Sequence, residues 1–436
     1  MERSNVMVVG VGRIGAVTAV GLSHLLSDVV AVDVNANRIR ELAAGHLSEA
    51  EPGLRAALKS ANRIRRIRFT TDVADATFDL AFLCVDTPPE ADGSPNLRQI
   101  FDAAHYAAAH LRPRGIVVTR ATVPPGAGDR LTSALKAIGR SDVQVAHVPE
   151  FLREGRAWED FREPDRLVIG ANSPNVAQRV RRVFSELPCP VFETDRRTAE
   201  LAKYAANAYL ATSISFANEL SDLGADLGAD VHQVFEILKA DRRIGPGAYL
   251  APGLGFGGHC FPKDTAALEY AGATRGMPMR QLAATIAVNQ RRVPSVQNWL
   301  RGVLGNLDGR RIAIAGLAFK PATDDLRESP ALRLANGLRA EGASVAGFDP
   351  LVTCAPPGIC LAANLTDAIE AADGLVLSHS GEWFAGLPLP QLAQVMRTPV
   401  VYDAALAFGD LPWHEHGIVT NHCNTFACEP APGSRA

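Results

Sequence analysis

The sequence predicts an α/β protein with two doubly wound parallel sheets and a long helix between them. Short apolar runs alternate with helical patterns between residues 6 and 148, which is typical of strand–helix units in a parallel sheet. A second alternation of this kind starts at residue 311. Between the two, residues 198–223 carry apolar side chains at helical spacing on more than one face. We therefore expect two or three domains.

The composition is that of an ordinary globular protein and argues against several classes of function. The 436 residues exceed the size at which a single core stops growing, and 47% of them are hydrophobic. A formal net charge of -3 gives no general attraction for nucleic acid or an anionic membrane. No signal-peptide pattern and no apolar stretch of about 18 residues is present, so we expect no membrane span. The seven cysteines are odd in number and form no C-x-x-C pair, which argues against a metal site or a disulfide framework and favours the cytoplasm.

The first apolar run leads into a glycine-rich turn with the features of a dinucleotide site. Gly10-Val-Gly-Arg-Ile-Gly15 is followed by a helical pattern, and Asp33 ends the next apolar run. Such a turn places a pyrophosphate on a helix N-terminus, while the acid accepts hydrogen bonds from ribose hydroxyls. Asp33 would repel a 2′-phosphate, so the pattern favours NAD over NADP. The expected cofactor-binding residues here are Gly10, Val11, Gly12, Arg13, Ile14, Gly15 and Asp33.

Polar residues after later apolar runs are candidates for cofactor contacts or catalysis. Thr87 and Thr122 would edge the cofactor at the carboxyl ends of strands, or they cap turns. Glu150 and Glu154 are four residues apart and share a face if this segment is helical. Paired carboxylates near a cofactor can do acid/base work, although a solvated charged turn is the common alternative.

The helix expected at 198–223 is suited to a spine between domains or to a subunit interface. Within it, Lys203 and Asn207 are an i,i+4 pair and face the same way. A lysine in so apolar a helix requires an anionic partner unless it snorkels to solvent.

A glycine-rich loop places one cysteine close to a cation and a carboxylate. In Gly253-Leu-Gly-Phe-Gly-Gly-His-Cys-Phe-Pro-Lys-Asp264, Cys260 follows four glycines and precedes Lys263 and Asp264. A thiol in such surroundings is placed to ionise and to act as a nucleophile. A small buried cysteine after an ordinary turn is the alternative. A helical run over 265–293 follows, and we expect Pro294 to disturb it.

The second α/β unit resembles a nucleotide-binding unit but lacks the G-x-G-x-x-G string. Only Gly316 stands at the end of its first strand, with Lys320 and Arg327 as nearby cations. This half would therefore bind a nucleotide other than the dinucleotide. Ser329-Pro330 predicts a helix start, with a side-chain cap and proline at the first position. Residues 423–436 are rich in Pro, Ala and Gly, and we expect them to fray.

Seven strings, in order over residues 6 to about 403, closely resemble the UDP-glucose/GDP-mannose dehydrogenase family. The string around Cys260 is highly specific for it. The strings are Gly10-Val-Gly-Arg-Ile-Gly15, Glu51-Pro-Gly-Leu54, Phe82-Leu-Cys-Val-Asp-Thr-Pro88, Pro149-Glu-Phe-Leu-Arg-Glu-Gly155, Ala199-Glu-Leu-Ala-Lys-Tyr-Ala-Ala-Asn207, Gly255-Phe-Gly-Gly-His-Cys-Phe-Pro-Lys-Asp264 and Gly316-Leu-Ala-Phe-Lys-Pro-Ala-Thr-Asp-Asp-Leu-Arg-Glu-Ser-Pro330.

The resemblance implies an N-terminal NAD domain at residues 1–196, a central helical dimerisation domain at 197–300 that carries the cysteine loop, and a C-terminal sugar-nucleotide domain at 301–436. It implies a homodimer that oxidises the 6-alcohol of a nucleotide-linked hexose to the carboxylate with two NAD⁺. The leading hypothesis is oxidation of UDP-glucose at C6 to UDP-glucuronate. Cys260 would form a thiohemiacetal that is oxidised to a thioester and hydrolysed. Glu150 would manage the hydrolytic water with help from Asp264, while Lys203 and Asn207 would stabilise developing oxyanions.

The resemblance also implies further binding residues. Lys320 would hold the sugar nucleotide, and Arg243 would reach the substrate across the dimer interface. The remaining cofactor contacts that it implies are Arg38, Thr87, Thr122, Glu154, Lys263 and Arg327. The substrate contacts that it implies are Glu150, Phe151, Leu152, Arg153, Lys203, Asn207, Arg243, Tyr249, Leu250, Gly253, Gly257, Phe319 and Lys320.

Three departures from the family pattern leave the substrate open. Asp86 replaces a usual glycine, Val148 replaces a usual asparagine, and Ala405 stands where an arginine would help to hold the substrate. Phe261 favours UDP-glucose, because GDP-mannose enzymes more often have leucine there. The alternatives are a dehydrogenase for another nucleotide sugar, such as GDP-mannose or a sugar of specialised metabolism, and a non-catalytic NAD or sugar-nucleotide sensor.

Overall fold

The computed structural model describes residues 4–25, 27–47, 50–74, 76–381, 389–408 and 411–421. The chain forms two compact units, which are described separately. The N-terminal unit comprises Met1–Ala208 and Lys263–Met279, and the C-terminal unit comprises Tyr209–Pro262 and Arg280–Ala436. Among the described residues, no helix combines the length and apolar character that crossing a membrane requires. The segment 423–436, predicted to fray, lies outside the described residues.

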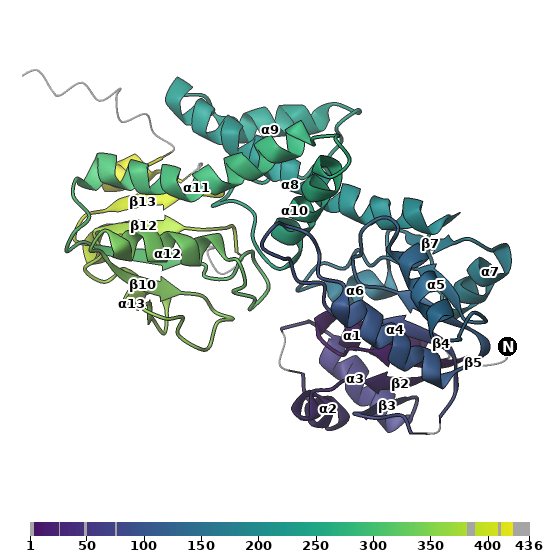
Figure 1. The fold of residues 1–436 in the computed structure, drawn as a ribbon. Coiled ribbons are helices and arrows are strands. Elements are labelled where there is room, and N and C mark those ends of the chain that lie inside the picture. Colours follow the sequence, from purple (N-terminus) through teal and green to yellow (C-terminus); the bar gives the residue numbers. More distant parts are fainter. Residues whose placement is uncertain are drawn as a thin grey trace, which may run out of the picture. The chain divides into compact units, whose positions relative to one another are not determined.

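The N-terminal unit is built on an eight-stranded sheet in the order β3-β2-β1-β4-β5-β6-β7-β8 (Figure 1). Its first six strands follow the dinucleotide-binding order, in which successive strands are added on one side of β1 up to β3 and then, from β4, on the other side. Only the β6–β7 pair is antiparallel. The strands are β1 Asn5–Val9, β2 Asp28–Val32, β3 Ile67–Thr70, β4 Phe78–Leu83, β5 Leu111–Thr119, β6 Gln144–His147, β7 Leu167–Ala171 and β8 Val191–Thr194.

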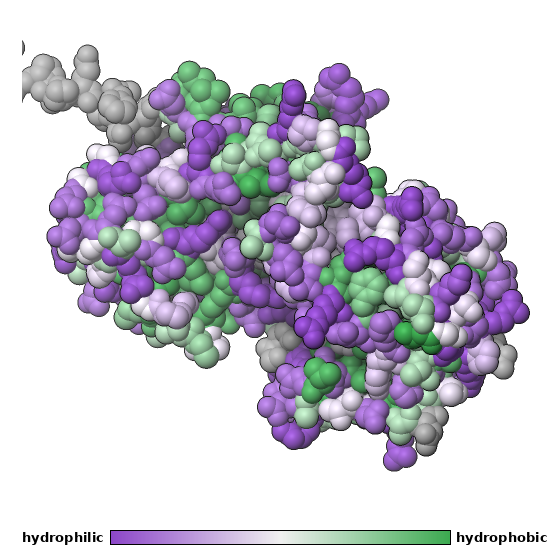
Figure 2. All heavy atoms as spheres, in the orientation of Figure 1, coloured by the Kyte–Doolittle hydropathy of each residue, from purple (hydrophilic) through white to green (hydrophobic). Residues whose placement is uncertain are grey.

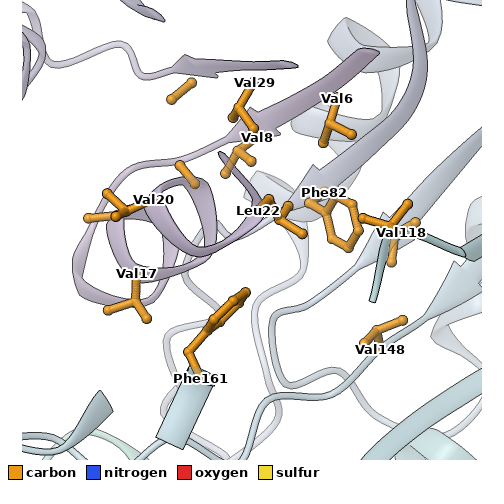
Figure 3. Packing of buried hydrophobic residues seen from close by; sticks show 14 of the residues in the cluster. Val6, Val8, Val17, Val20, Leu22, Val29, Phe82, Val118, Val148 and Phe161 are labelled. Carbon is orange, nitrogen blue, oxygen red and sulfur yellow. The ribbon is translucent and has the colours of Figure 1, made fainter. Parts of the chain in front are cut away.

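Helices cover both faces of this sheet because its strands are apolar on both sides. On one face α1, α2, α3, α6 and α7 contribute to a core with Phe82, Val118 and Val148, and Figure 3 shows Phe161 of α6 in the same cluster. On the other face α4 and α5 pack a second core. The helices are α1 Arg13–His24, α2 Ala36–Ala43, α3 Leu54–Arg63, α4 Arg98–His110, α5 Ala127–Ala137, α6 Ala157–Arg162 and α7 Pro174–Val183.

The C-terminal unit contains a six-stranded parallel sheet in the order β11-β10-β9-β12-β13-β14. This is the same doubly wound order, which confirms the predicted fold class. Helices α11 (Arg280–Leu304) and α12 pack on one face, and α13 and α14 on the other. The elements are β9 Arg311–Ala315, α12 Pro330–Ala340, β10 Ser344–Phe348, β11 Cys360–Leu361, α13 Leu365–Ile369, β12 Gly374–Leu377, α14 Leu389–Val395, β13 Val400–Asp403, η2 Trp413–His416 and β14 Val419–Thr420.

The remaining helices are α8 Arg196–Leu227, α9 Val231–Ala240, α10 Cys260–Ala273 and α11 Arg280–Leu304. The predicted helix over 265–293 was wrong, because residues 274–279 separate α10 from α11. Gly276 has a positive φ of 70°, and Pro278 disfavours helical backbone at Met277 before it. Pro294 lies inside α11, where buried Val293, Val296 and Leu300 keep the helix packed despite one lost hydrogen bond.

The apolar side chains expected on more than one face of α8 are only partly buried. Tyr204 is 2% exposed, but Tyr209 is 69% exposed and Leu223 is 54% exposed. The apolar pattern therefore includes a stripe that a single chain leaves uncovered.

Candidate functional site

The turn after β1 has the shape that a dinucleotide requires. A Cβ at Gly15 would lie 1.9 Å from the carbonyl oxygen of Gly10, so α1 reaches the strand this closely only with glycine there. A Cβ at Gly12 would meet nothing within 4 Å, which leaves open space at the start of α1. Gly12 has no side chain to cap α1, so the first amides of this helix can donate hydrogen bonds to the oxygens of a pyrophosphate.

Asp33 and Arg38 are tied to this turn by hydrogen bonds. The Val11 amide donates to Asp33 Oδ2 at 2.8 Å, and the Asn35 amide donates to Oδ1 at 2.8 Å. Arg38 Nε donates to the Val11 carbonyl at 3.1 Å. Each oxygen of an ionised carboxylate accepts more than one hydrogen bond, so Asp33 keeps acceptor capacity for ribose hydroxyls. These residues fit NAD.

Lys203 has the anionic partner that its buried position requires. Its Nζ lies 3.2 Å from Glu150 Oε1, and the side chains are 5% and 6% exposed. The Leu152 amide donates to the other oxygen, Glu150 Oε2, at 2.7 Å. The Phe151 ring centroid lies 5.4 Å from the same ammonium. The two charges are therefore held together away from solvent, and Lys203 does not snorkel.

Asn207, one turn further along α8, contacts a second buried carboxylate. Its Nδ2 donates to Asp264 Oδ2 at 2.6 Å, and Asp264 is fully buried. Lys263 Nζ donates to Asp264 Oδ1 at 2.7 Å and to Thr87 Oγ1 at 3.4 Å. Thr87 in turn donates to the Thr122 carbonyl at 3.0 Å. The structure thus connects residues from three of the predicted motifs in one hydrogen-bonded chain.

The segment that carries Glu150 and Glu154 is not helical, so the two carboxylates do not share a helix face. Residues 148–153 have no regular secondary structure, and a turn at 154–156 leads into α6. Gly155 has a positive φ of 80°, which interrupts any helix through the segment. Arg153 pairs instead with Asp160, with Nη2 and Oδ1 2.5 Å apart.

In the C-terminal unit, Cys260 begins α10 at the end of a loop whose backbone is fixed from several elements. The Gly253 amide donates to Asn218 Oδ1 of α8 at 2.8 Å, and Arg292 Nε of α11 donates to the Gly253 carbonyl at 2.6 Å. Asn289 accepts from the Phe256 amide at 2.7 Å and donates to its carbonyl at 3.1 Å. Cys260 is partly buried and takes part in no disulfide.

Two glycines allow this loop to approach the segment before α12. A Cβ at Gly257 would lie 2.2 Å from the Glu328 carbonyl oxygen, and one at Gly258 would lie 2.7 Å from the Phe319 ring. The Gly258 amide donates to the Arg327 carbonyl at 3.1 Å. The structure therefore brings the predicted residues Gly257, Phe319 and Arg327 together.

Other predicted substrate residues of this unit lie at its surface or carry local contacts. Arg243 is 88% exposed and pairs with Asp241, and Tyr249 is 44% exposed. Leu250 packs on the small core that contains Val231 and Phe235. Lys320 Nζ lies 5.7 Å from the Phe319 ring centroid.

The structure also shows polar residues that sequence reasoning did not single out. Glu200 is fully buried and accepts hydrogen bonds from the amides of Gly126 and Gly128. His147 is fully buried, with Nδ1 2.8 Å from Thr119 Oγ1, and burial lowers its pKa to about 3. No sequence pattern marks these residues, except that Glu200 lies three residues before Lys203 within a quoted string.

Comparison with known proteins identifies the family. The models named UDP-glucose/GDP-mannose dehydrogenase family match with the NAD binding domain at residues 4–188, the central domain at 197–291 and the UDP binding domain at 313–409. The chain belongs to this family. It is an NAD-dependent oxidoreductase of the nucleotide-sugar dehydrogenases, as the resemblance predicted.

Curated relatives and solved structures agree with this assignment. The UDP-glucose 6-dehydrogenase YwqF of Bacillus subtilis is 35% identical over 408 residues, which cover 92% of each chain. The UDP-glucose 6-dehydrogenase of Rhizobium meliloti is 37% identical, with 91% of this chain and 94% of the relative covered. A UDP-glucose dehydrogenase structure from Pyrobaculum islandicum has a TM-score of 0.87 and 36% identity, covering 93% of this chain and 94% of its own. A UDP-D-ManNAc dehydrogenase structure from Pyrococcus horikoshii has a TM-score of 0.85 and 25% identity, covering 95% and 98%.

Proposed function

We propose that this protein oxidises the C6 alcohol of UDP-glucose to the carboxylate of UDP-glucuronate. The observation that carries the proposal is the pair of buried carboxylate contacts on one face of α8, Lys203 with Glu150 and Asn207 with Asp264. A preorganised cation and an amide donor are the groups that stabilise oxyanions, and a buried carboxylate is suited to managing water. The names of the curated relatives support the same reaction.

Two oxidations at one carbon explain the need for the cysteine. NAD⁺ supplies a hydride acceptor for each oxidation. After the alcohol has become an aldehyde, the Cys260 sulfur adds to the carbonyl carbon to give a thiohemiacetal, which can lose a second hydride. The resulting thioester is hydrolysed by water, which releases the acid and restores the thiol. Lys203 and Asn207 stabilise the oxyanions, and Glu150 with Asp264 takes up and returns protons at the water. The residues named above for cofactor and substrate keep these roles in the proposal.

Stoichiometry and a cysteine variant test this proposal. Purified protein with UDP-glucose and excess NAD⁺ should form two NADH per sugar, followed by absorbance. Cys260→Ala should abolish formation of the acid, and Cys260→Ser should block or trap the covalent stage. A ratio of one NADH per sugar, or unchanged acid formation in the serine variant, would refute the thioester route.

A dehydrogenase for another nucleotide sugar is the second candidate. Ala405 stands where an arginine would help to hold the substrate, and the solved structures similar to this chain include the UDP-D-ManNAc dehydrogenase. A panel of UDP-, GDP- and dTDP-sugars decides between the candidates by kcat/KM. A wide preference for UDP-glucose rejects the alternative, and NADH formation that depends on Cys260 rejects a non-catalytic sensor.

We also propose a homodimer and a cytoplasmic location. Tyr209, Phe216, Leu223 and Leu227 are spaced along one side of α8 and are 48–69% exposed, and Ile237 of α9 is 70% exposed. Figure 2 shows apolar side chains, in green, over these helices at the top of the view. A second copy would cover this stripe. Light scattering should give twice the chain mass, and Phe216→Glu should reduce it to one. No described cysteine is in a disulfide, which suits a reducing compartment.

A further inference from the structure

Glu200 has a place in the N-terminal unit that the proposed chemistry does not use. It lies on α8 between Arg196 and Lys203, and it is fully buried. Its Oε2 accepts from the Gly126 amide at 2.6 Å, and its Oε1 accepts from the Gly128 amide at 2.8 Å. Both amides belong to the start of α5, so a carboxylate from a distant helix caps α5.

The backbone at this point is adapted to the carboxylate. Gly126 has a positive φ of 98°, which few other residues adopt. A Cβ at Gly128 would lie 3.0 Å from Glu200 Oε1, so a side chain there would press on the carboxylate. Arg196, one turn earlier on α8, pairs with Asp129 in the same first turn of α5, with Nη2 and Oδ1 2.5 Å apart. The start of α5 is therefore held on α8 by two side chains one helical turn apart, Arg196 and Glu200.

The segment that Glu200 holds continues directly into the hydrogen-bonded chain described above. Thr122 lies four residues before Gly126, and its carbonyl accepts the hydrogen bond of Thr87. From Thr87 the series of hydrogen bonds continues through Lys263 and Asp264 and returns to α8 at Asn207. The contacts thus form a closed ring that leaves α8 at Glu200 and returns to it at Asn207, and all its members belong to the N-terminal unit.

We propose that Glu200 is a positioning residue that fixes the Thr122 loop and, through Thr87 and Lys263, sets the cofactor-binding edge next to the Asn207–Asp264 pair. The inference rests on the proposed roles of Thr87, Thr122 and Lys263 as cofactor contacts. A buried carboxylate that only stabilised the fold would leave the affinity for NAD⁺ unchanged in variants that still fold. A positioning carboxylate changes that affinity, because the loop loses its fixed distance from α8.

Glu200→Gln is the first variant to measure. Glutamine keeps the shape, but its single carbonyl oxygen accepts from only one of the two glycine amides while its NH₂ faces the other. The Kd for NAD⁺, measured by calorimetry without sugar, should rise about tenfold, which is the loss expected from one hydrogen bond to a charged group. The control is Glu219→Gln on the same helix, where the side chain is 58% exposed and 3.7 Å from Arg291. The control should bind NAD⁺ like the parent protein.

A double-variant cycle separates positioning from a general loss of stability. Thr87→Val removes the central hydroxyl of the ring and puts a methyl group in its place, which keeps the branched shape of the side chain. If Glu200 acts through the ring, Glu200→Gln combined with Thr87→Val should raise the Kd no further than the larger single effect. The proposal is overturned if the Kd of the double variant rises by the product of the two single increases. It is also overturned if Glu200→Gln has native circular dichroism and an unchanged Kd for NAD⁺. Because calorimetry with NAD⁺ needs no turnover, a failure of the proposed substrate, seen as no NADH from UDP-glucose, remains distinguishable.

Discussion

Replacement of Lys203 by methionine should destabilise the N-terminal unit more than any surface charge deletion. Methionine keeps the length of the side chain but leaves Glu150, 6% exposed, without its cation. Loss of one partner from a buried ion pair costs about 3–5 kcal/mol. The Leu152 amide still donates to Glu150 at 2.7 Å, so we expect the lower end, about 3 kcal/mol.

The double variant Lys203→Met with Glu150→Gln removes both charges and tests the cause of this loss. Its free energy of unfolding should be about 2 kcal/mol higher than that of Lys203→Met alone, since no uncompensated charge remains buried. Catalysis should not recover, because in the proposed mechanism Lys203 stabilises the oxyanion, and loss of one such group lowers kcat about 10²–10³-fold. The control is Arg156→Met, whose pair with Glu159 is 2.7 Å long but about half exposed, and which should cost about 1 kcal/mol or less.

Urea unfolding with hydrogen exchange of peptides from α8 and residues 148–156 measures these changes in the N-terminal unit. NADH formation from UDP-glucose measures catalysis in parallel. The reasoning is refuted if the double variant is less stable than Lys203→Met, because the two side chains would then contribute independently. It is equally refuted if Arg156→Met and Lys203→Met cost the same.

Two further predictions concern packing and pH. Gly257→Ala should raise the KM for the nucleotide sugar about tenfold, because its Cβ would meet the Glu328 carbonyl at 2.2 Å. Gly247→Ala, where a Cβ meets nothing within 4 Å, should leave KM unchanged, and equal effects would contradict the clash. Burial lowers the pKa of His147 to about 3, below the value in the unfolded chain, so stability is present above the unfolded pKa and is lost as pH falls. Between pH 7.5 and 5.5 the free energy of unfolding of the parent should fall by about 1.4 kcal/mol more than that of His147→Gln. Identical profiles of unfolding free energy against pH would show that His147 is not the cause of this pH dependence.

Features that local sequence determines were predictable. Ser329 caps α12 by accepting from the Leu332 amide, with Pro330 at the first position, as the Ser329-Pro330 pair predicted. These signals lie within a few residues of the element that they define. Short-range signals also predicted the glycine turn before α1, the position of Asp33 beside it, and the i,i+4 spacing of Lys203 and Asn207 on one helix.

Contacts between residues distant in sequence were not predictable in this way. Glu200 reaches amides 72 and 74 positions away, and Asn289 holds Phe256 over 33 positions. A buried carboxylate or amide has no periodic signature, because only the folded backbone supplies its partners. The break between α10 and α11 was missed for a different reason. Apolar periodicity continues across Gly276 and Pro278, and these two residues are the only local signal for the break.

Two of the three departures from the family pattern, Val148 and Asp86, have structural roles within the N-terminal unit. Val148 is fully buried in the core with Phe82 and Val118 (Figure 3). An apolar side chain at this position therefore contributes to packing of the core. Asp86 Oδ1 accepts from the Thr87 amide at 2.7 Å, which gives this carboxylate a local role in the turn.

Ala405 is the departure that still bears on recognition. Its amide donates to Asp403 Oδ1 at 3.2 Å, and the Phe408 amide donates to Oδ2 at 2.8 Å, so the turn after β13 forms without an arginine side chain. Arg292, a buried cation of the same unit, already donates to the Gly253 carbonyl and pairs with Asp222, so its charge is committed to holding the loop. Arg292 therefore does not compensate for the arginine that is missing at position 405.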